Sequence, residues 1–192
     1  PQNWSLIANL AYGVTAGLDV QTSTNDYFAS QDLVETGMAV GQRAFMTGPG
    51  VFSNNDFRSY EATLDYLKRY DEHYRTPNIK SYMVGNRQQR QWVVKASEEL
   101  GLMPTTEGGR DMTLDITHAI DGFHGNEHTL PVTPIYRDVI ELYARTKTAY
   151  TPTLLVQYGG PSGVHWFFTR EEVHDDPKLN RFYPHNRLDQ MT

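Results

Sequence analysis

Apolar positions along this chain follow two spacings, one typical of helices and one typical of buried strands. The longest helical pattern covers residues 59–74, in which Tyr60, Leu64 and Leu67 recur at intervals of three and four residues. The segment VTAGLDV, which follows Gly13, is instead a short apolar run. A run of that length predicts a strand that is buried on both faces.

The two patterns alternate along the whole chain, with no break typical of a domain linker. Predicted strands begin near residues 14, 42, 79, 103, 123 and 151, and predicted helices cover 4–12, 26–36, 59–74 with Ser59 as N-cap, 87–100, 112–120 and 136–146. Such alternation predicts parallel strands joined by crossover helices. The two folds of this kind are an open doubly wound sheet and a (β/α)8 barrel. No G-x-G-x-x-G or G-x-x-x-x-G-K-[ST] motif follows any predicted strand, which disfavours a nucleotide-binding doubly wound domain.

The length of the chain then bounds the fold. A barrel of roughly 250 residues uses about 31 residues for each β/α unit, so 192 residues hold about six units. We therefore predict an α/β fold: an incomplete (β/α)8 TIM-type barrel of about six units, strands two to seven, forming one domain over residues 1–192. The aromatic, proline-containing residues 161–192 are predicted to be an irregular tail of that domain.

Composition narrows the function. The formal net charge is −6 and the Lys and Arg residues are spread along the chain, which argues against a nucleic-acid partner. No segment approaches the roughly 18 to 20 apolar residues of a membrane span. There is no cysteine, which excludes disulfides, thiolate zinc sites and a cysteine nucleophile. A small-molecule or peptide substrate is the expected partner.

The chain starts at Pro1 with no signal-like segment, so we expect a removed targeting segment or a piece of a longer protein.

Active sites of barrels form at the carboxyl ends of their strands and in the loops that follow. Polar residues at or just after predicted strands are therefore the candidates for chemistry, and they are Asp19, Lys80, Glu107, Glu127, His128 and Gln157. His73 and His118 lie within predicted helices, where a solvated or partly packed histidine is the expected role.

Lys80 interrupts an otherwise apolar strand, and burying an ammonium costs several kcal/mol unless the charge is paired or removed. One interpretation is a lysine with a lowered pKa that acts as a base or a Schiff-base amine, or that reacts with carbon dioxide to give a carbamate for metal ions. The other interpretation is a structural ion pair with Glu107. The residues alone leave both open. Glu107 precedes two glycines that would let the backbone approach a ligand, and a strand-end histidine such as His128 suits a metal.

Together these motifs resemble the amidohydrolase superfamily. The resemblance rests on GVTAGLDV, on Lys80 in an apolar strand, on TTEGG, on DGFHGNEH and on YTPTLLVQYGG. The likeness is greatest to imidazolonepropionase-like amidohydrolases fused to a TolB or tricorn-type β-propeller, and it runs over essentially the whole chain. It suggests a secreted or periplasmic bacterial parent, or a cytoplasmic one.

The resemblance implies a barrel that uses one or two divalent metals, usually zinc, to attack an amide or related C–N bond. Lys80, which could be carboxylated, and His128 match the fourth-strand lysine and sixth-strand histidine of the family, and Glu107 stands in place of the fifth-strand histidine. These three are the predicted metal ligands, and no residue is assigned as catalytic. The candidates for substrate contacts are Asp19, His124, Gln157 and Tyr158.

The family's His-x-His strand and the strand of its catalytic aspartate have no counterpart in the sequence. We therefore expect a fragment that is inactive by itself and binds zinc weakly. The alternative is a non-catalytic incomplete barrel that serves as an assembly or binding module. In either case, exposed strand edges predict a homo-oligomer.

Overall fold

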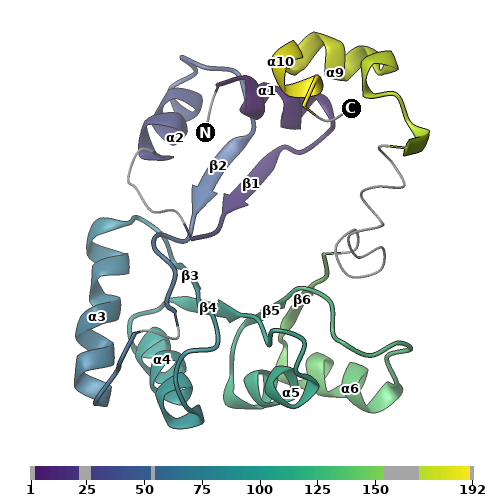
Figure 1. Ribbon diagram of the computed structural model, residues 1–192. Coiled ribbons are helices and arrows are strands. Elements are labelled where there is room, and N and C mark those ends of the chain that lie inside the picture. Colours follow the sequence, from purple (N-terminus) through teal and green to yellow (C-terminus); the bar gives the residue numbers. More distant parts are fainter. Residues whose placement is uncertain (1–2, 22–26, 53–54, 154–168, 191–192) are drawn as a thin grey trace. The chain divides into compact units, whose positions relative to one another are not determined.

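The computed structural model describes residues 3–21, 27–52, 55–153 and 169–190 (Figure 1). The chain divides into two compact units. The first unit comprises residues 1–19, 24–45 and 155–192, and the second comprises 20–23 and 46–154. The second unit is thus formed almost entirely by one continuous stretch of chain, whereas the first is assembled from three stretches.

The second unit is built on a parallel four-stranded sheet. Its strands are β3 (Asn78–Lys80), β4 (Met103–Thr106), β5 (Gly125–Glu127) and β6 (Ala149–Thr151), and they lie in that order. Each strand is followed or preceded by a helix, namely α3 (Tyr60–His73), α4 (Arg87–Glu99), α5 (Met112–Asp121) and α6 (Arg137–Thr146). Figure 1 shows α4, α5 and α6 on the same side of this sheet. The arrangement is the one that alternating strands and helices predict.

The helices of this unit begin and end at residues suited to capping. Ser59 caps α3 as predicted, because its side chain accepts a hydrogen bond from a backbone amide of the first turn. Asn86 and Gln89 form a reciprocal capping box at the start of α4. Asp111 caps α5, which ends at Gly122 with φ of 96°, a left-handed conformation that glycine adopts at little cost.

The core of the second unit lies between the sheet and these helices. Its largest cluster of buried apolar residues comprises Val51, Phe57, Leu67, Tyr70, Ile79, Val84, Val93, Val94, Ala96, Leu102 and Phe123. A smaller cluster, formed by Ala119, Leu130 and Tyr143, packs beneath α5 and α6. Ile79, in the strand before the buried lysine, is fully buried. This packing fixes β3, and with it the position of Lys80.

The first unit contains α1 (Asn3–Ala11), β1 (Ala16–Asp19), α2 (Tyr27–Glu35) and the start of β2 (Arg43–Met46). β1 pairs with β2 in a two-stranded sheet, and the two point the same way (Figure 1). The prediction that β1 is buried on both faces is not met, because Leu18 is 44 % exposed. Among the described residues only β2 pairs with β1, and the six described strands do not close into a barrel.

The tail also differs from its prediction as an irregular segment. Its described part contains a 3₁₀ turn (Val173–Asp175) and the short helices α9 (Pro177–Phe182) and α10 (His185–Leu188). Asp176 caps α9, and Pro177 has the φ that a first helical turn needs. α9 packs on α1, where the Tyr12 hydroxyl donates to Asp176 Oδ1 at 2.9 Å. This tertiary contact, which the local pattern does not reveal, stabilises the helix.

The predicted strand near residue 151 begins slightly earlier, at Ala149, and ends at Thr151. Residues 154–168, which include Gln157 and Tyr158, lie outside the described part of the chain. In the part that is described, no helix has the length and apolar character required to cross a bilayer.

Candidate active site

Four charged or titratable side chains meet where three neighbouring strands of the second unit end. Lys80 is the last residue of β3, Glu107 directly follows β4, Glu127 is the last residue of β5 and His128 follows it. Carboxyl ends of adjacent parallel strands lie at one edge of a sheet, so the side chains gather there. We call these four residues the Lys80 cluster.

The register of the strands explains why the cluster forms. Lys80 pairs with Thr105 of β4, and Thr105 pairs with Gly125 of β5, so the three residues lie at one level of the sheet. Glu107 and Glu127 each lie two residues further along, which places both on the same face as the lysine. The lysine side chain is long enough to reach that next level, and its ammonium meets the two carboxylates there.

Lys80 is the buried cation of the cluster, with only 1 % of its side chain exposed. Its Nζ contacts Glu127 Oε2 and lies 3.4 Å from Glu107 Oε2. The ring of Tyr82 lies 4.8 Å from Nζ, which adds a cation–π contact. Two carboxylates for one ammonium give these three groups a net charge of −1. The ion pair that the sequence left as one interpretation is therefore present, but Glu127 is the closer partner.

His128 connects the cluster to the end of β6. Its Nε2 lies 2.7 Å from Glu107 Oε2 and its Nδ1 lies 2.7 Å from the Thr153 hydroxyl. The backbone of His128 is left-handed, with φ of 69°, which is uncommon for a residue with a side chain. Its amide donates to Thr151 O at 3.0 Å, so two contacts with β6 and the residues after it hold the strained residue in place. The imidazole is 47 % exposed and is the most accessible member of the cluster.

Glu127 is held on its other oxygen by Thr105. The Thr105 hydroxyl lies 2.6 Å from Glu127 Oε1 and 3.2 Å from the carbonyl oxygen of Ile79. A hydroxyl has one proton to donate, and the shorter contact with a carboxylate is the stronger bond. Both oxygens of Glu127 therefore have a donor, one from Thr105 and one from Lys80.

Behind the cluster, Asp115 of α5 ties together the two strand ends that carry the glutamates. Asp115 is buried, and its Oδ1 accepts from Asn126 Nδ2 at 3.0 Å. The backbone amide of Gly108, next to Glu107, also bonds this carboxylate. Burial raises the pKa of Asp115, and the bonds from Asn126 and Gly108 oppose that rise. A side chain at Gly108 would collide with the carboxylate, so glycine is needed there for close approach.

Sequence reasoning brought Lys80, Glu107 and His128 together, and the structure places these three in contact. It left Glu127 outside the ligand set although Glu127 also ends a strand, because the register that brings Glu127 to Lys80 is not visible in one sequence. Asp115 was missed. The signal for it was a carboxylate on the face of α5 that also carries the buried Ala119.

Of the four residues predicted to contact substrate, His124 alone is both described and in the unit that carries the cluster. His124 is exposed and precedes β5, at the amino end of the strand whose carboxyl end carries Glu127. Asp19 ends β1 in the first unit. Gln157 and Tyr158 are outside the described residues. These assignments stay predictions.

Whether the cluster fits a metal ion depends on Lys80. Carboxylate oxygen and imidazole nitrogen are both zinc ligands. Glu107 Oε2 and His128 Nε2 lie 2.7 Å apart, so the two side chains would need to move apart only slightly to bind one ion between them. As an ammonium, however, Lys80 already pairs with Glu107 and Glu127 and would repel a cation. Within the described ranges, no group of three or more His, Cys, Asp or Glu side chains has a metal-holding arrangement. The donors fit a divalent ion only when Lys80 is no longer positively charged.

Solved structures show what this fold resembles. A Xaa-Pro dipeptidase with methionine bound in its active site matches 97 % of this chain over 50 % of its own, with TM-score 0.63 and 14 % identity. An amidohydrolase matches 93 % of this chain over 55 % of its own, with TM-score 0.62 and 13 % identity. Phenylurea hydrolase B matches 77 % over 44 %, with TM-score 0.58 and 15 % identity. No protein-family model and no curated protein matches the sequence.

These likenesses concern the fold alone, and they confirm the predicted α/β fold with parallel strands and an incomplete barrel. The chain spans about half the length of the structures that it resembles.

Proposed function

We propose that this chain is part of a metal-dependent hydrolase that cleaves an amide or another C–N bond of a small-molecule or peptide substrate. The observation that supports it most is the contact among Lys80, Glu107 and His128 at the carboxyl ends of parallel strands. The fold likeness to a dipeptidase, an amidohydrolase and a phenylurea hydrolase agrees with this chemistry.

In this proposal Glu107 and His128 would hold a divalent ion, of which zinc suits the donors best. The bound ion would supply a hydroxide from water near neutral pH. Lys80 joins the ligands as a carbamate: its ammonium and carbon dioxide give the carbamate anion and release two protons. The charge of the lysine head group then changes from +1 to −1.

That change determines how the cluster behaves. The charge of Lys80, Glu107 and Glu127 together goes from −1 to −3, and such a concentration of negative charge persists only with a cation beside it. Metal binding and carbamate formation therefore favour one another. Thr105 bonds Glu127 Oε1, the oxygen that does not face Lys80, so this bond would keep Glu127 oriented after its lysine partner has changed charge.

The experiment measures zinc affinity, because the chain spans half of the similar structures and binding tests its own contribution. Calorimetric titration of the wild-type chain without bicarbonate should show weak binding. Lys80→Gln removes the competing ammonium and should tighten binding by about tenfold or more. Bicarbonate should tighten binding in the wild type and not in Lys80→Gln. A ¹³C carbamate signal should accompany the tightening.

Two histidine variants serve as a matched pair. In the Lys80→Gln background, His128→Ala should abolish the increase in zinc affinity. His73→Ala, which changes an exposed histidine of α3, should preserve that increase. If Lys80→Gln binds zinc no better than the wild type, Lys80 is a structural ion-pair partner and the metal site is wrong.

A second candidate function is assembly with another copy of the chain. It is favoured by the exposure of Val14 and Leu18, apolar residues at and beside the strand that sequence analysis expected to be buried. A homodimer covering them would be seen in sedimentation velocity at micromolar concentration. A monomer under those conditions would exclude this candidate and leave the hydrolase proposal standing.

A further inference from the structure

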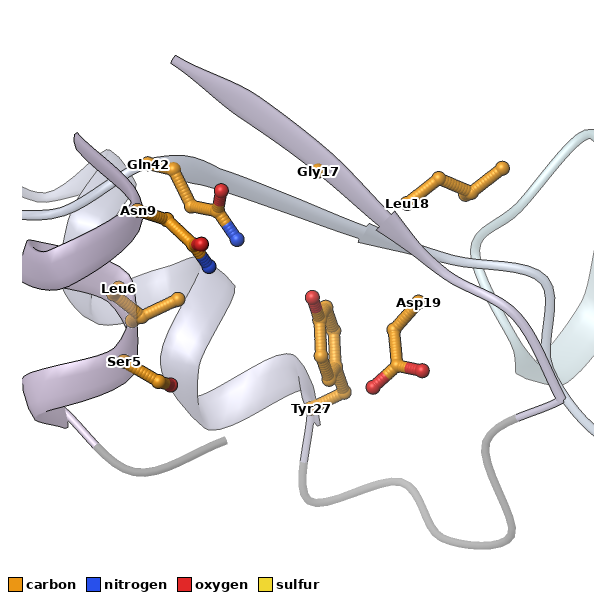
Figure 2. Close-up of a pocket in the computed structure, with 8 residues that line it drawn as sticks. All are labelled: Ser5, Leu6, Asn9, Gly17, Leu18, Asp19, Tyr27 and Gln42. Atoms are coloured by element: carbon orange, nitrogen blue, oxygen red, sulfur yellow. The ribbon is translucent and has the colours of Figure 1, made fainter. Parts of the chain in front are cut away.

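The first unit contains a cavity of about 280 Å³ between its helices and its strands. Residues of α1, β1 and α2 line it, together with Gln42, which precedes β2. Figure 2 shows the carboxamides of Gln42 and Asn9 on one side of the Tyr27 ring and the Asp19 carboxylate on the other. None of these residues belongs to the Lys80 cluster.

Gln42 carries the main argument, because it is a buried polar group without a partner. The residue is 7 % exposed, and its Oε1 has no hydrogen bond in the described part of the chain. Buried amide oxygens in folded proteins nearly always have a donor, so an exception indicates a missing one. The cavity that Gln42 lines is where such a donor would lie.

Gly17 fits the same interpretation. A Cβ at Gly17 would lie 2.8 Å from Gln42 Nε2, so the carboxamide rests directly against the strand backbone. The φ of Gly17 is not in the left-handed region, and backbone conformation therefore does not require glycine there. What glycine provides is space for the Gln42 amide beside the cavity.

Charge indicates the class of ligand. Asp19 is the one ionised group among the lining residues, and none of them is Lys, Arg or His. No salt bridge to Asp19 is found among the described residues. Tyr27 is buried beside it, and burial together with the charge of Asp19 raises the pKa of Tyr27, so its hydroxyl stays neutral. The cavity thus has a cation-accepting end and, at the carboxamides, a neutral hydrogen-bonding end.

We propose that this cavity binds a small primary amine that carries a neutral hydrogen-bonding group, with the ammonium at Asp19 and the neutral group at Gln42 and Asn9. The volume is near the lower end for ligand sites, which suits a molecule of amino-acid size. Leu6 gives the wall apolar surface for a short aliphatic side chain. This inference does not depend on the hydrolase proposal.

The test uses three ligands of one shape with the whole 192-residue chain. L-leucinamide has both polar groups, 4-methylpentanamide lacks the amine, and L-leucine has a carboxylate in place of the amide. Calorimetry or ligand-observed NMR should show L-leucinamide binding at least tenfold more tightly than either of the other two. Equal binding of L-leucinamide and 4-methylpentanamide, or no L-leucinamide binding at millimolar concentration, would overturn the proposal.

Variants locate the site. Asp19→Asn removes the charge of Asp19 and leaves its side-chain shape almost unchanged. It should reduce L-leucinamide affinity at least tenfold and leave the affinity for 4-methylpentanamide unaffected. Gly17→Ala should weaken both, because the new methyl group displaces the Gln42 carboxamide. Glu35→Gln, which removes a negative charge at the exposed end of α2, is the control and should bind like the wild type. If Asp19→Asn also binds like the wild type, the ammonium does not lie at Asp19 and the assignment fails.

Discussion

The Lys80 cluster of the second unit and the Gln42 cavity of the first unit differ in how their buried polar groups are satisfied. In the second unit Lys80 has two carboxylate partners, and both oxygens of Glu127 have donors. In the first unit Gln42 Oε1 is buried without a partner. A buried group that is satisfied within the chain contributes to stability and resists substitution, whereas one that is left unsatisfied costs stability and is available to a ligand. We therefore expect substitutions in the Lys80 cluster to lower the free energy of unfolding far more than substitutions at the cavity do.

The largest effect is expected from Glu127→Ala, which removes the nearer partner of the buried Lys80. Leaving a buried charge uncompensated costs about 3–5 kcal/mol of unfolding free energy, and Glu107 at 3.4 Å recovers only part of it. Urea denaturation of the folded chain measures the loss. The double variant Lys80→Met with Glu127→Leu should recover most of the stability. A loss below about 1 kcal/mol for the single variant would mean that the ion pair is not formed in solution.

The next effect concerns His118, which is fully buried in α5 with no hydrogen-bond partner on either ring nitrogen in the described structure. Burial, together with the nearby Arg90, lowers the pKa of His118 to about 4, and Asp121 opposes that shift. The unfolded chain, with a pKa near 6.5, then binds more protons than the folded chain between those two values. Stability is therefore full above about pH 6.5 and falls by up to about 3 kcal/mol as the pH approaches 4.

The measurement is the unfolding free energy as a function of pH for the wild type and His118→Leu. The difference between the two curves isolates this histidine from the other titrating groups. This difference should change most between pH 6.5 and 4, and curves that stay parallel through this range would show that His118 is not buried as a neutral group.

A smaller loss, about 2 kcal/mol, is expected for Gly108→Ala. The new methyl group would displace the Asp115 carboxylate, which then loses bonds from Gly108 and Asn126 while remaining buried. Gly101→Ala is the comparison, because it adds a methyl group in open space and costs only the strain of a left-handed backbone. Thermal or urea unfolding of both variants should rank Gly108→Ala as the less stable. The reverse order would show that Asp115 does not stabilise the chain by connecting the ends of β4 and β5.

The smallest effect is expected from Asp19→Asn, which should change the unfolding free energy by no more than about 0.5 kcal/mol. Asp19 is exposed and has no ion pair among the described residues, so nothing within the chain is lost. Circular dichroism during urea unfolding would detect a larger change. A loss comparable to that of Glu127→Ala would show that Asp19 is structural and would end the contrast between the Lys80 cluster and the Gln42 cavity.

Much of the fold could be predicted from the sequence, because caps and glycine stops are local signals. Ser59 was predicted as an N-cap and the structure confirms it, and Gly122 ends α5 in the left-handed conformation that glycine favours. The burial of β1 was predicted wrongly, since an apolar run shows what a strand is suited to and not which neighbours cover it. The helices of the tail depend on contacts between α9 and α1, which lie far apart in the chain. Lys80, Glu107 and His128 could be predicted because each lies at the end of a predicted strand. The roles of Glu127 and Asp115 could not, because they depend on strand register and helix packing.

The contact between α1 and α9 also bears on the order in which the chain folds. It joins residues 164 positions apart, through Tyr12 and Asp176, so the first unit can form only after almost the whole polypeptide has been brought into a closed loop. Closing a loop of that length costs entropy before any contact is gained, and non-local contacts slow folding. The second unit consists almost wholly of one continuous segment whose strands pair with near neighbours in sequence. We therefore expect amides of β3–β5 to become protected from hydrogen exchange before those of α1 when the chain refolds.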